Sequence, residues 1–433
     1  MSLPKGWIET SLGALCSKPQ YGYTTKASNE GDVKFLRTTD VTKPVLNWEK
    51  VPYCLVNPSS VDKYLLENGD IVISRAGSVG YSCRLENIPV DTVFASYLIR
   101  FKPNKLIDGA FIKHFLNAPE YWQQITDVSA GIAVQNINAK KLEVIKLPLP
   151  PLNEQKRIAK KLDELLTTVE SIKTRLDNAP TIIKRFRQSI LAAATSGKLT
   201  EEWRKENGVS EHWEKLTIDD VVHVKGGKRL PKGESLVFED TGYPYIKAGQ
   251  LKNGTVNPKK QEYLTKEVQE KISRYIVNAG DVYITIVGAC IGDAGLIPKE
   301  FDKANLTENA VKLCEFKKDI ENIFLSLWMR SYYIQNEIQS EIKSGAQGKL
   351  AIKRIKTLPF NLPTRAEQKE IVSQVESLFA LADTLEEKIK AAKKRVDKLT
   401  QSILAKAFKG ELVPQEPNDE PAEELLERIK SLA

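Results

Sequence analysis

The sequence of 433 residues has no long hydrophobic run. No segment contains the roughly 18 consecutive apolar residues of a membrane-spanning helix. Residues 1–7 also lack the apolar stretch of a signal peptide. We therefore expect a cytoplasmic protein.

Cysteine and histidine are scarce, with five and three copies. No two cysteines have the Cys-x-x-Cys spacing that is typical of zinc sites. A metal site is therefore disfavoured, and reduced, mostly buried thiols are the simpler interpretation.

The motifs of common enzymes are missing too. The chain has no Gly-x-x-x-x-Gly-Lys-Ser/Thr loop, no Gly-x-Gly-x-x-Gly fingerprint, no His-Glu-x-x-His pair and no Gly-x-Ser-x-Gly elbow. Adenine methyltransferases hold a base with Asp/Asn-Pro-Pro-Tyr/Phe, but Asn57-Pro58 and Asn257-Pro258 lack the second proline and the aromatic residue. Together these absences favour a binding protein without a catalytic site or a cofactor of its own.

Positive charge exceeds negative charge moderately. Lysine and arginine number 64 against 56 aspartates and glutamates, for a formal charge of +8. This balance favours an anionic partner without requiring one. With 41% hydrophobic residues, the length is enough for two or three domains.

Two stretches share one heptad rhythm of apolar residues, with alternating spacings of four and three, as coiled-coil helices have. The first lies within residues 153–197, and its seam consists of Ile158, Leu162, Leu165, Val169, Ile172, Leu176, Ala179, Ile183, Phe186 and Ile190. The second repeats every position, at Ile371, Val375, Leu378, Ala382, Leu385, Ile389, Ala392, Val396, Leu399 and Ile403. A single heptad helix is usually a dimerisation device, whereas two in register favour an internal duplication whose helices pair with each other.

Local signals mark the ends and the middle of these helices. Asn153 is the expected N-cap of the first helix, and Thr364 and Glu367 have capping-box spacing at the start of the second. Pro180 predicts a kink or a short break, because proline removes a helical hydrogen bond.

A segment rich in predicted strands precedes each helix. In the first copy, residues 33–37, 71–74 and 93–101 are predicted strands and residues 111–125 a helix, and Gly69-Asp70 corresponds to Gly280-Asp281 in the second copy. The predicted parts are residues 1–150, a first domain; 151–200, a helical region; 201–363, a connector and a second domain; 364–410, a second helical region; and 411–433, an acidic tail. The tail is either solvated or a docking segment. We predict an α+β fold with two duplicated mixed α/β domains and two long helices that pair as an intramolecular antiparallel coiled coil.

Several loops have residues suited to phosphates and base edges. Residues 74–81 place an arginine, hydroxyls and two glycines directly after a strand, whereas residues 285–292 lack the arginine, so that a simple β-turn is an equal alternative there. Residues 129–138 and 344–350 carry Gln, Asn and Lys, which can pair with base edges. The basic stretch 225–229, the counterpart of residues 18–23, is as readily a solvated loop. The candidate DNA contacts are Lys18, Tyr21, Arg75, Ser78, Tyr81, Gln135, Asn136, Lys225, Lys228, Arg229, Gln347 and Lys349.

Over nearly its whole length the chain resembles the specificity subunit of type I restriction-modification systems. The resemblance rests on the duplicated order of motifs: Glu154-Gln155-Lys156 and Glu367-Gln368-Lys369 at the helix starts, the opening residues 3–7, the Gly-Asp strands, and the endings 196–200 and 409–414. It implies a non-catalytic subunit that reads a bipartite double-stranded DNA target, with one half-site per target-recognition domain. It also implies two modification subunits and restriction subunits as partners, which would hold S-adenosylmethionine, ATP and Mg.

Two alternatives remain. An interaction scaffold that does not bind DNA would have the same coiled coil. A fused restriction enzyme would need a catalytic domain of its own, and no stretch is left over to form one.

Overall fold

The computed structural model describes residues 3–43, 45–129, 136–344 and 348–431. Its contacts form two compact units: unit 1 comprises Met1–Asp177 and Ala391–Ala433, and unit 2 comprises Asn178–Lys390. Two helices of 44 residues each, α6 (Leu152–Thr195) and α13 (Arg365–Phe408), contribute to both units. None of the described helices is long and apolar enough to cross a membrane.

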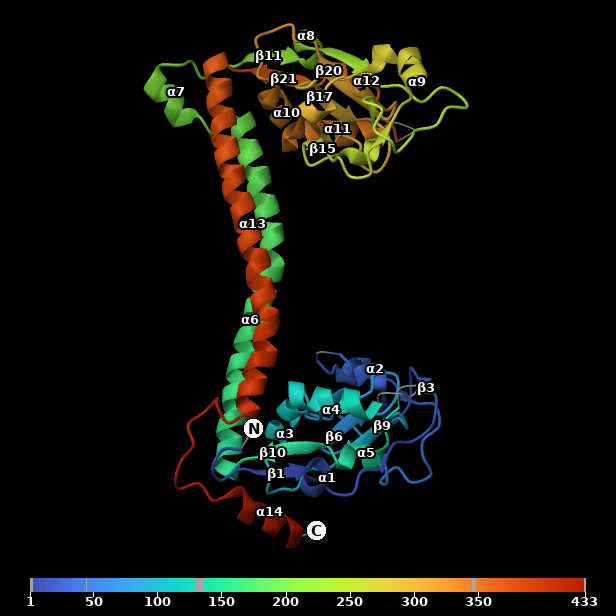
Figure 1. The fold of residues 1–433 in the computed structure, drawn as a ribbon, viewed down its shortest axis with the longest axis vertical. Coiled ribbons are helices and arrows are strands. Elements are labelled where there is room, and N and C mark those ends of the chain that lie inside the picture. Colours follow the sequence, from blue (N-terminus) through green and yellow to red (C-terminus); the bar gives the residue numbers. More distant parts are fainter. Residues whose placement is uncertain (1–2, 44, 130–135, 345–347, 432–433) are drawn as a thin grey trace. The chain divides into compact units, whose positions relative to one another are not determined.

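The globular part of unit 1 combines two four-stranded sheets with short helices (Figure 1). Its strands are β1 (Ile8–Ser11), β2 (Gln20–Tyr21), β3 (Ala27–Ser28), β4 (Lys34–Leu36), β5 (Tyr53–Cys54), β6 (Ile71–Ser74), β7 (Ser82–Arg84), β8 (Thr92–Phe94), β9 (Leu98–Phe101) and β10 (Lys146–Leu149). Its helices, besides α6 and α13, are α1 (Leu12–Leu15), α2 (Thr38–Val41), η1 (Trp48–Lys50), α3 (Gly109–Phe115), α4 (Pro119–Ser129), α5 (Ala139–Glu143) and α14 (Ala422–Ser431). One sheet has the antiparallel order β2-β9-β6-β7, and the other has the order β3-β5-β4-β8 with β4 and β8 parallel.

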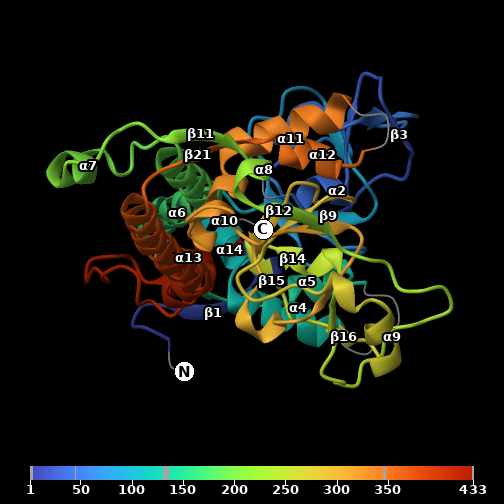
Figure 2. The same cartoon turned by 90° about the horizontal axis from the view of Figure 1, so that it is seen from above.

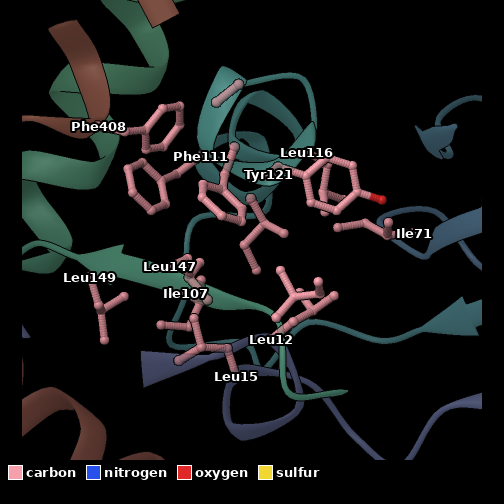
Figure 3. Packing of buried hydrophobic residues seen from close by; sticks show 14 of the residues in the cluster. Leu12, Leu15, Ile71, Ile107, Phe111, Leu116, Tyr121, Leu147, Leu149 and Phe408 are labelled. Atoms are coloured by element: carbon pink, nitrogen blue, oxygen red, sulfur yellow. The ribbon is translucent and has the colours of Figure 1, made fainter. Parts of the chain in front are cut away.

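Strand β6 is buried on both faces, and this explains its continuous apolar sequence. Ile71 and Ile73 belong to a core that also contains residues of α3 and α4, whereas Val72 belongs to a second core with the other sheet. Figure 3 shows the first core, in which Phe408 of α13 packs against Phe111 of α3 with ring centres 5.3 Å apart. The end of one long helix is therefore part of the core of unit 1.

Unit 2 repeats much of this arrangement, with one four-stranded sheet and a second sheet of three strands. Its strands are β11 (Glu214–Thr217), β12 (His223–Gly226), β13 (Pro244–Ile246), β14 (Leu251–Lys252), β15 (Thr255–Val256), β16 (Glu262–Tyr263), β17 (Val282–Thr285), β18 (Ala294–Leu296), β19 (Asn305–Leu306), β20 (Ala310–Cys314) and β21 (Pro359–Leu362). Its further helices are α7 (Glu201–Asn207), α8 (Ile218–Val221), η2 (Ala248–Gln250), α9 (Lys266–Lys271), η3 (Ser273–Tyr275), η4 (Lys299–Phe301), α10 (Asn322–Arg330), α11 (Tyr332–Ser344) and α12 (Ile352–Lys356). The order β12-β20-β17-β18 matches β2-β9-β6-β7 of unit 1, and the parallel pair β13–β19 matches β4–β8. Figure 2 shows α12 beside α8 and β12 in this unit.

In both units a strand pair leads into a long helix. Strand β1 pairs with β10 directly before α6, and β11 pairs with β21 directly before α13, both antiparallel. The duplication predicted from the sequence is therefore present in the topology as well.

Two predicted elements of the first domain are divided. The predicted strand over residues 93–101 is two strands, β8 and β9, separated by a turn in which Leu98 N donates to Ala95 O at 2.8 Å. The predicted helix over residues 111–125 is α3 and α4, with Pro119 at the first position of α4. A proline is favourable there because the first helical N–H has no partner within the helix.

The two long helices pair antiparallel within each unit (Figure 1). In unit 1, Lys173 pairs with Asp397 at 4.0 Å and Asp177 with Lys393 at 2.8 Å, so the partner number falls as the first number rises. In unit 2, Arg187 of α6 pairs with Asp383 of α13 at 2.6 Å. The seam residues Ile158 and Leu162 are buried in the core of unit 1, and Ile190, Ile371 and Val375 are buried in the core of unit 2. The predicted antiparallel coiled coil is confirmed.

The local signals of the helices agree only in part with the structure. Helix α6 continues through Pro180, so of the predicted kink or short break the break is wrong, and the kink stays a prediction. Pro180 is exposed, and the carbonyl group that it leaves unbonded can be hydrated. The helix begins at Leu152, which places the expected N-cap, Asn153, inside its first turn. Thr364 does cap α13, because its Oγ1 accepts from Glu367 N at 3.3 Å.

The acidic tail is docked on unit 1. Ala422, Leu425 and Ile429 of α14 are buried in the core of that unit, and Ala422 N donates to Gly6 O at 3.0 Å. Before α14, Asp419 pairs with Arg157 at 2.7 Å. Of the two alternatives for the tail, the structure therefore supports the docking segment.

Candidate nucleic-acid interface

Three of the predicted contact residues meet in one cluster of unit 1, formed by Tyr21, Arg75 and Asn136. The Arg75 Nε donates to Asn136 Oδ1 at 3.3 Å, and its guanidinium carbon lies 4.8 Å from the centre of the Tyr21 ring. The Tyr21 hydroxyl accepts from Ala139 N at 2.9 Å. Residues far apart in the sequence, from β2, the loop after β6 and the segment before α5, thus converge at one place.

The backbone holds these loops together. Ala76 forms an isolated antiparallel bridge with Asn136, and Ile137 N donates to Arg75 O at 2.9 Å. Arg75 N in turn donates to Tyr97 O at 2.8 Å. The position of Arg75 is therefore fixed by two neighbouring segments and does not depend on its side chain alone.

Exposed aromatic side chains occur on the segments that form the cluster or adjoin it. Tyr21 is 39% exposed, Tyr81 47% and Tyr97 61%. Aromatic rings beside a guanidinium group combine stacking or apolar contact with charge, which suits nucleic acid. Tyr97 was not among the predicted contacts, although its place between two apolar strand runs was a usable signal.

The two glycines of the loop after β6 have different roles. Gly80 has a φ of 87°, and a Cβ there would lie 2.8 Å from the Ile125 side chain, so this glycine allows α4 to approach. Its carbonyl accepts from the Tyr121 hydroxyl at 2.7 Å. Gly77, with a φ of 81°, has open space around it. Ser78, between them, is half-buried, whereas Gly77 is exposed. A phosphate could therefore approach the backbone of this loop most closely at Gly77.

Two predicted residues of the first domain stand apart from the Arg75 contacts. Tyr81 packs against the Trp122 ring, with ring centres 5.2 Å apart. Lys18 is exposed and lines a cavity of about 980 Å³ together with Lys102 and Lys105. No described contact links Lys18 to the cluster of Tyr21, Arg75 and Asn136.

Unit 2 joins the equivalent loops by the same pairing. Val287 bridges Lys349 as Ala76 bridges Asn136, and Leu350 N donates to Ile286 O at 3.0 Å. Lys349 is exposed. The bridging position that is Asn136 in unit 1 is thus a lysine in unit 2, and this loop after β17 has no arginine.

The basic stretch 225–229 has partners inside the chain. Lys225 forms an ion pair with Glu315, and Arg229 Nε donates to Glu308 at 3.0 Å. The Lys228 ammonium lies 5.6 Å from the centre of the Tyr275 ring. These contacts lower the free positive charge of the stretch. Gln135 and Gln347, also among the predicted contacts, lie outside the described residues.

A close backbone approach makes this stretch equivalent to residues 18–23. A Cβ on Gly227 would lie 2.0 Å from Thr307 O, and one on Gly22 would lie 2.3 Å from Phe94 O. Only glycine fits at either position, because a Cβ this close to a backbone oxygen is not tolerated.

The Glu-Gln-Lys motif attaches each helix to its globular part. Trp7 Nε1 donates to Glu154 Oε2 at 3.0 Å, and Trp213 Nε1 donates to Glu367 Oε2 at 3.1 Å. Gln155 and Gln368 each donate to a proline carbonyl five residues earlier, at 2.9 and 3.0 Å. Each glutamine also accepts from a backbone N–H at the start of a helix of its unit. The motif is therefore structural, because all four side chains are buried.

Comparisons with known proteins agree with this duplicated architecture. The family model of the type I restriction modification DNA specificity domain matches residues 4–180 and again residues 210–394. The chain therefore belongs to the family of type I restriction-modification specificity subunits.

Named relatives and solved structures cover from 74% to 99% of the chain. The EcoKI specificity subunit of Escherichia coli (strain K12) is 32% identical over 463 residues, covering 99% of this chain and 96% of the relative. The EcoBI specificity subunit of Escherichia coli is 35% identical, covering 74% of this chain and 71% of the relative. The crystal structure of the HsdS subunit from Thermoanaerobacter tengcongensis has a TM-score of 0.66 at 16% identity, over 95% of this chain and 99% of that one. A chain from a study of complex assembly and conformational transition of the type I R-M system has a TM-score of 0.68 at 17% identity, over 95% of this chain and all of that one.

Proposed function

We propose that this chain reads a bipartite double-stranded DNA target for a type I restriction-modification complex. Residues 1–150 and 201–363 are the two target-recognition domains, and each takes one half-site. The observation that carries the proposal is the family match over both halves of the chain. The meeting of Tyr21, Arg75 and Asn136 supports it, because a positive charge beside an exposed ring is suited to a DNA backbone.

The chain acts without catalysis of its own. The partners are two modification subunits, which carry S-adenosylmethionine, and restriction subunits, which carry ATP and Mg; these complexes work in the cytoplasm. The buried carboxylates at the helix starts are engaged by tryptophan side chains, which favours a structural role for them. The chain contributes recognition and a scaffold.

A domain exchange tests this function. Residues 1–150 are replaced by the corresponding domain of another member of the family, and the complex with modification subunits is assayed by sequencing methylated adenines. We expect one half-site to change and the other to stay. A change in both half-sites would contradict the assignment of one half-site to each domain.

The isolated chain provides the second test. Incubated with labelled S-adenosylmethionine and DNA, it should transfer no methyl group, while it should retain DNA affinity that falls as salt rises. Methyl transfer by the isolated chain would overturn the non-catalytic role. Absence of affinity for all DNA at moderate salt, alone and in the complex, would favour the scaffold that does not bind DNA.

A further inference from the structure

The carboxylates of Glu154 and Glu367 stand at matched positions of the two units but have different surroundings. Glu367 is fully buried and accepts from Trp213 through one oxygen. Its other oxygen accepts from Thr200 Oγ1 at 2.7 Å and from the guanidinium of Arg204. The charge of Glu367 is thus neutralised by an arginine of the segment that follows α6.

Glu154 lacks this second set of partners. It is 1% exposed, and its Oε2 accepts from Trp7. Its Oε1 has no hydrogen-bond partner among the described residues. The nearby guanidinium of Arg157 is directed to Asp419 at 2.7 Å and to Pro414 O at 3.4 Å. Its Nε has no hydrogen-bond partner among the described residues, so Arg157 acts on Glu154 through its charge and not through a hydrogen bond. A buried carboxylate oxygen without a donor is costly, so its surroundings are informative.

A cavity of about 560 Å³ lies beside Glu154. Trp7, Pro151 and residues of the segment after α13 line it. That segment contains no helix or strand between residues 411 and 421. The segment after α13 corresponds in chain order to the segment after α6, which supplies Arg204 to Glu367 in unit 2. In unit 1 the segment after α13 supplies carboxylates to the cavity instead. The charged residues that line the cavity are Lys5, Glu154, Glu416, Asp419 and Glu423.

We infer that this cavity binds the guanidinium group of an arginine supplied by a protein partner. The arginine takes the place at Glu154 that Arg204 takes at Glu367. A planar guanidinium group donates to a carboxylate in a fixed geometry, whereas an ammonium group is a hydrated point charge. A metal ion is a poor alternative, because no group of three or more potential metal ligands exists among the described residues. The inference rests on the buried carboxylate and does not depend on DNA recognition.

The test uses the full chain labelled with 5-fluorotryptophan and the small probe ethylguanidinium chloride at millimolar concentration. The fluorine resonance of Trp7, assigned from its loss in Trp7→Phe, should shift and saturate, since Trp7 shares the Glu154 carboxylate with the probe. The Trp213 resonance should stay unchanged because Glu367 already has Arg204. Ethylammonium chloride at the same concentration should have a much smaller effect.

Two variants make the test specific. Glu154→Gln keeps the size and the acceptor for Trp7 but removes the charge, so the saturable shift of Trp7 should vanish. Arg204→Ala opens the matched site, so the Trp213 resonance should now respond to ethylguanidinium. No saturable Trp7 shift in the unaltered chain, or the same shift in Glu154→Gln, would overturn the site.

A final measurement identifies the source of the arginine. In the complex with modification and restriction subunits, the Trp7 resonance should be shifted already and should no longer respond to ethylguanidinium. A Trp7 resonance that still responds would overturn a partner arginine at this position. Such a result would not affect the outcome of the domain exchange, or the function that the domain exchange tests.

Discussion

Units 1 and 2 have the same backbone framework but different polar side chains around it. The sheet order, the strand pair before each long helix and the Trp–Glu hydrogen bond occur in both units. In contrast, the loop bridge is Ala76–Asn136 in one unit and Val287–Lys349 in the other. Buried contacts constrain the framework, whereas the loops vary because they lie at the surface. The comparison separates the residues that hold a domain in place from those that can set its preference.

The largest expected effect comes from changing the length of the helices that both units share. Seven residues inserted after Asp177 and seven inserted before Lys393 lengthen both helices and keep the heptad seam in register. Because seven residues add about 10 Å, the complex should keep both half-sites but require more unread bases between them. Methylation-site sequencing measures this change. An unchanged spacing would contradict the idea that the helices set the distance between half-sites.

The matched control is the insertion in α6 alone. Lys173 and Asp397 can stay paired, but Arg187 and its neighbours move out of register with Asp383 of α13, so we expect loss of folding or of subunit assembly. Assembly is measured by size-exclusion chromatography with the modification subunits. A single insertion that assembles normally would argue against a specific register between the helices.

The next effect concerns the buried ion pair of unit 2. Arg204→Ala leaves Glu367 buried without its cation, which should lower the free energy of unfolding by about 3–5 kcal/mol. Urea unfolding followed by tryptophan fluorescence measures it. Lys205→Ala, which removes an exposed partner of Glu201, is the control and should have little effect. Equal unfolding curves for the two variants would show that the buried pair contributes no net stability.

Single contacts in the loops should have smaller effects, on binding and not on stability. Arg75→Ala should weaken DNA binding nearly equally for all sequences if Arg75 meets a phosphate. Lys349→Ala should change base preference in one half-site if the lysine reads guanine, by about 1–3 kcal/mol for a good bidentate contact. Competition binding with a panel of DNA duplexes measures both, with Lys205→Ala as a control for net charge. Small, equal effects for all three variants would identify Arg75 and Lys349 as ordinary surface residues.

The smallest effect is a difference in thiol reactivity between the units. Cys290 in unit 2 is exposed, whereas burial raises the pKa of Cys16 to about 12 and that of Cys54 to about 11 in unit 1. Thiols with such a pKa carry almost no thiolate at pH 8. Maleimide labelling of the native chain at pH 8 should therefore modify Cys290 first, as peptide mass spectrometry can detect. Fast labelling of Cys16 would contradict the burial of its thiol.

The duplicated plan and the pairing of the long helices could be predicted from the amino-acid sequence. Heptad spacing follows directly from the pitch of a helix, and ten matching seam positions define one register. Glu154 and Glu367 were recognisable as motif members. Strand boundaries within residues 93–101 were not, because turns such as Ala95–Leu98 depend on the pairing of β8 and β9 in separate sheets.

The tertiary structure was needed to place the separate motifs next to one another. It joined Tyr21, Arg75 and Asn136, which no local pattern connects, because the contact depends on the strand order β2-β9-β6. In the folded chain, Lys225 and Arg229 form ion pairs with glutamates that are distant in the sequence. The tertiary structure also docked the acidic tail on unit 1, because the apolar face of α14 has a core to join there. Long-range packing is not encoded in the spacing of neighbouring residues, so Glu154 and Glu367, identical in sequence motif, differ in their partners.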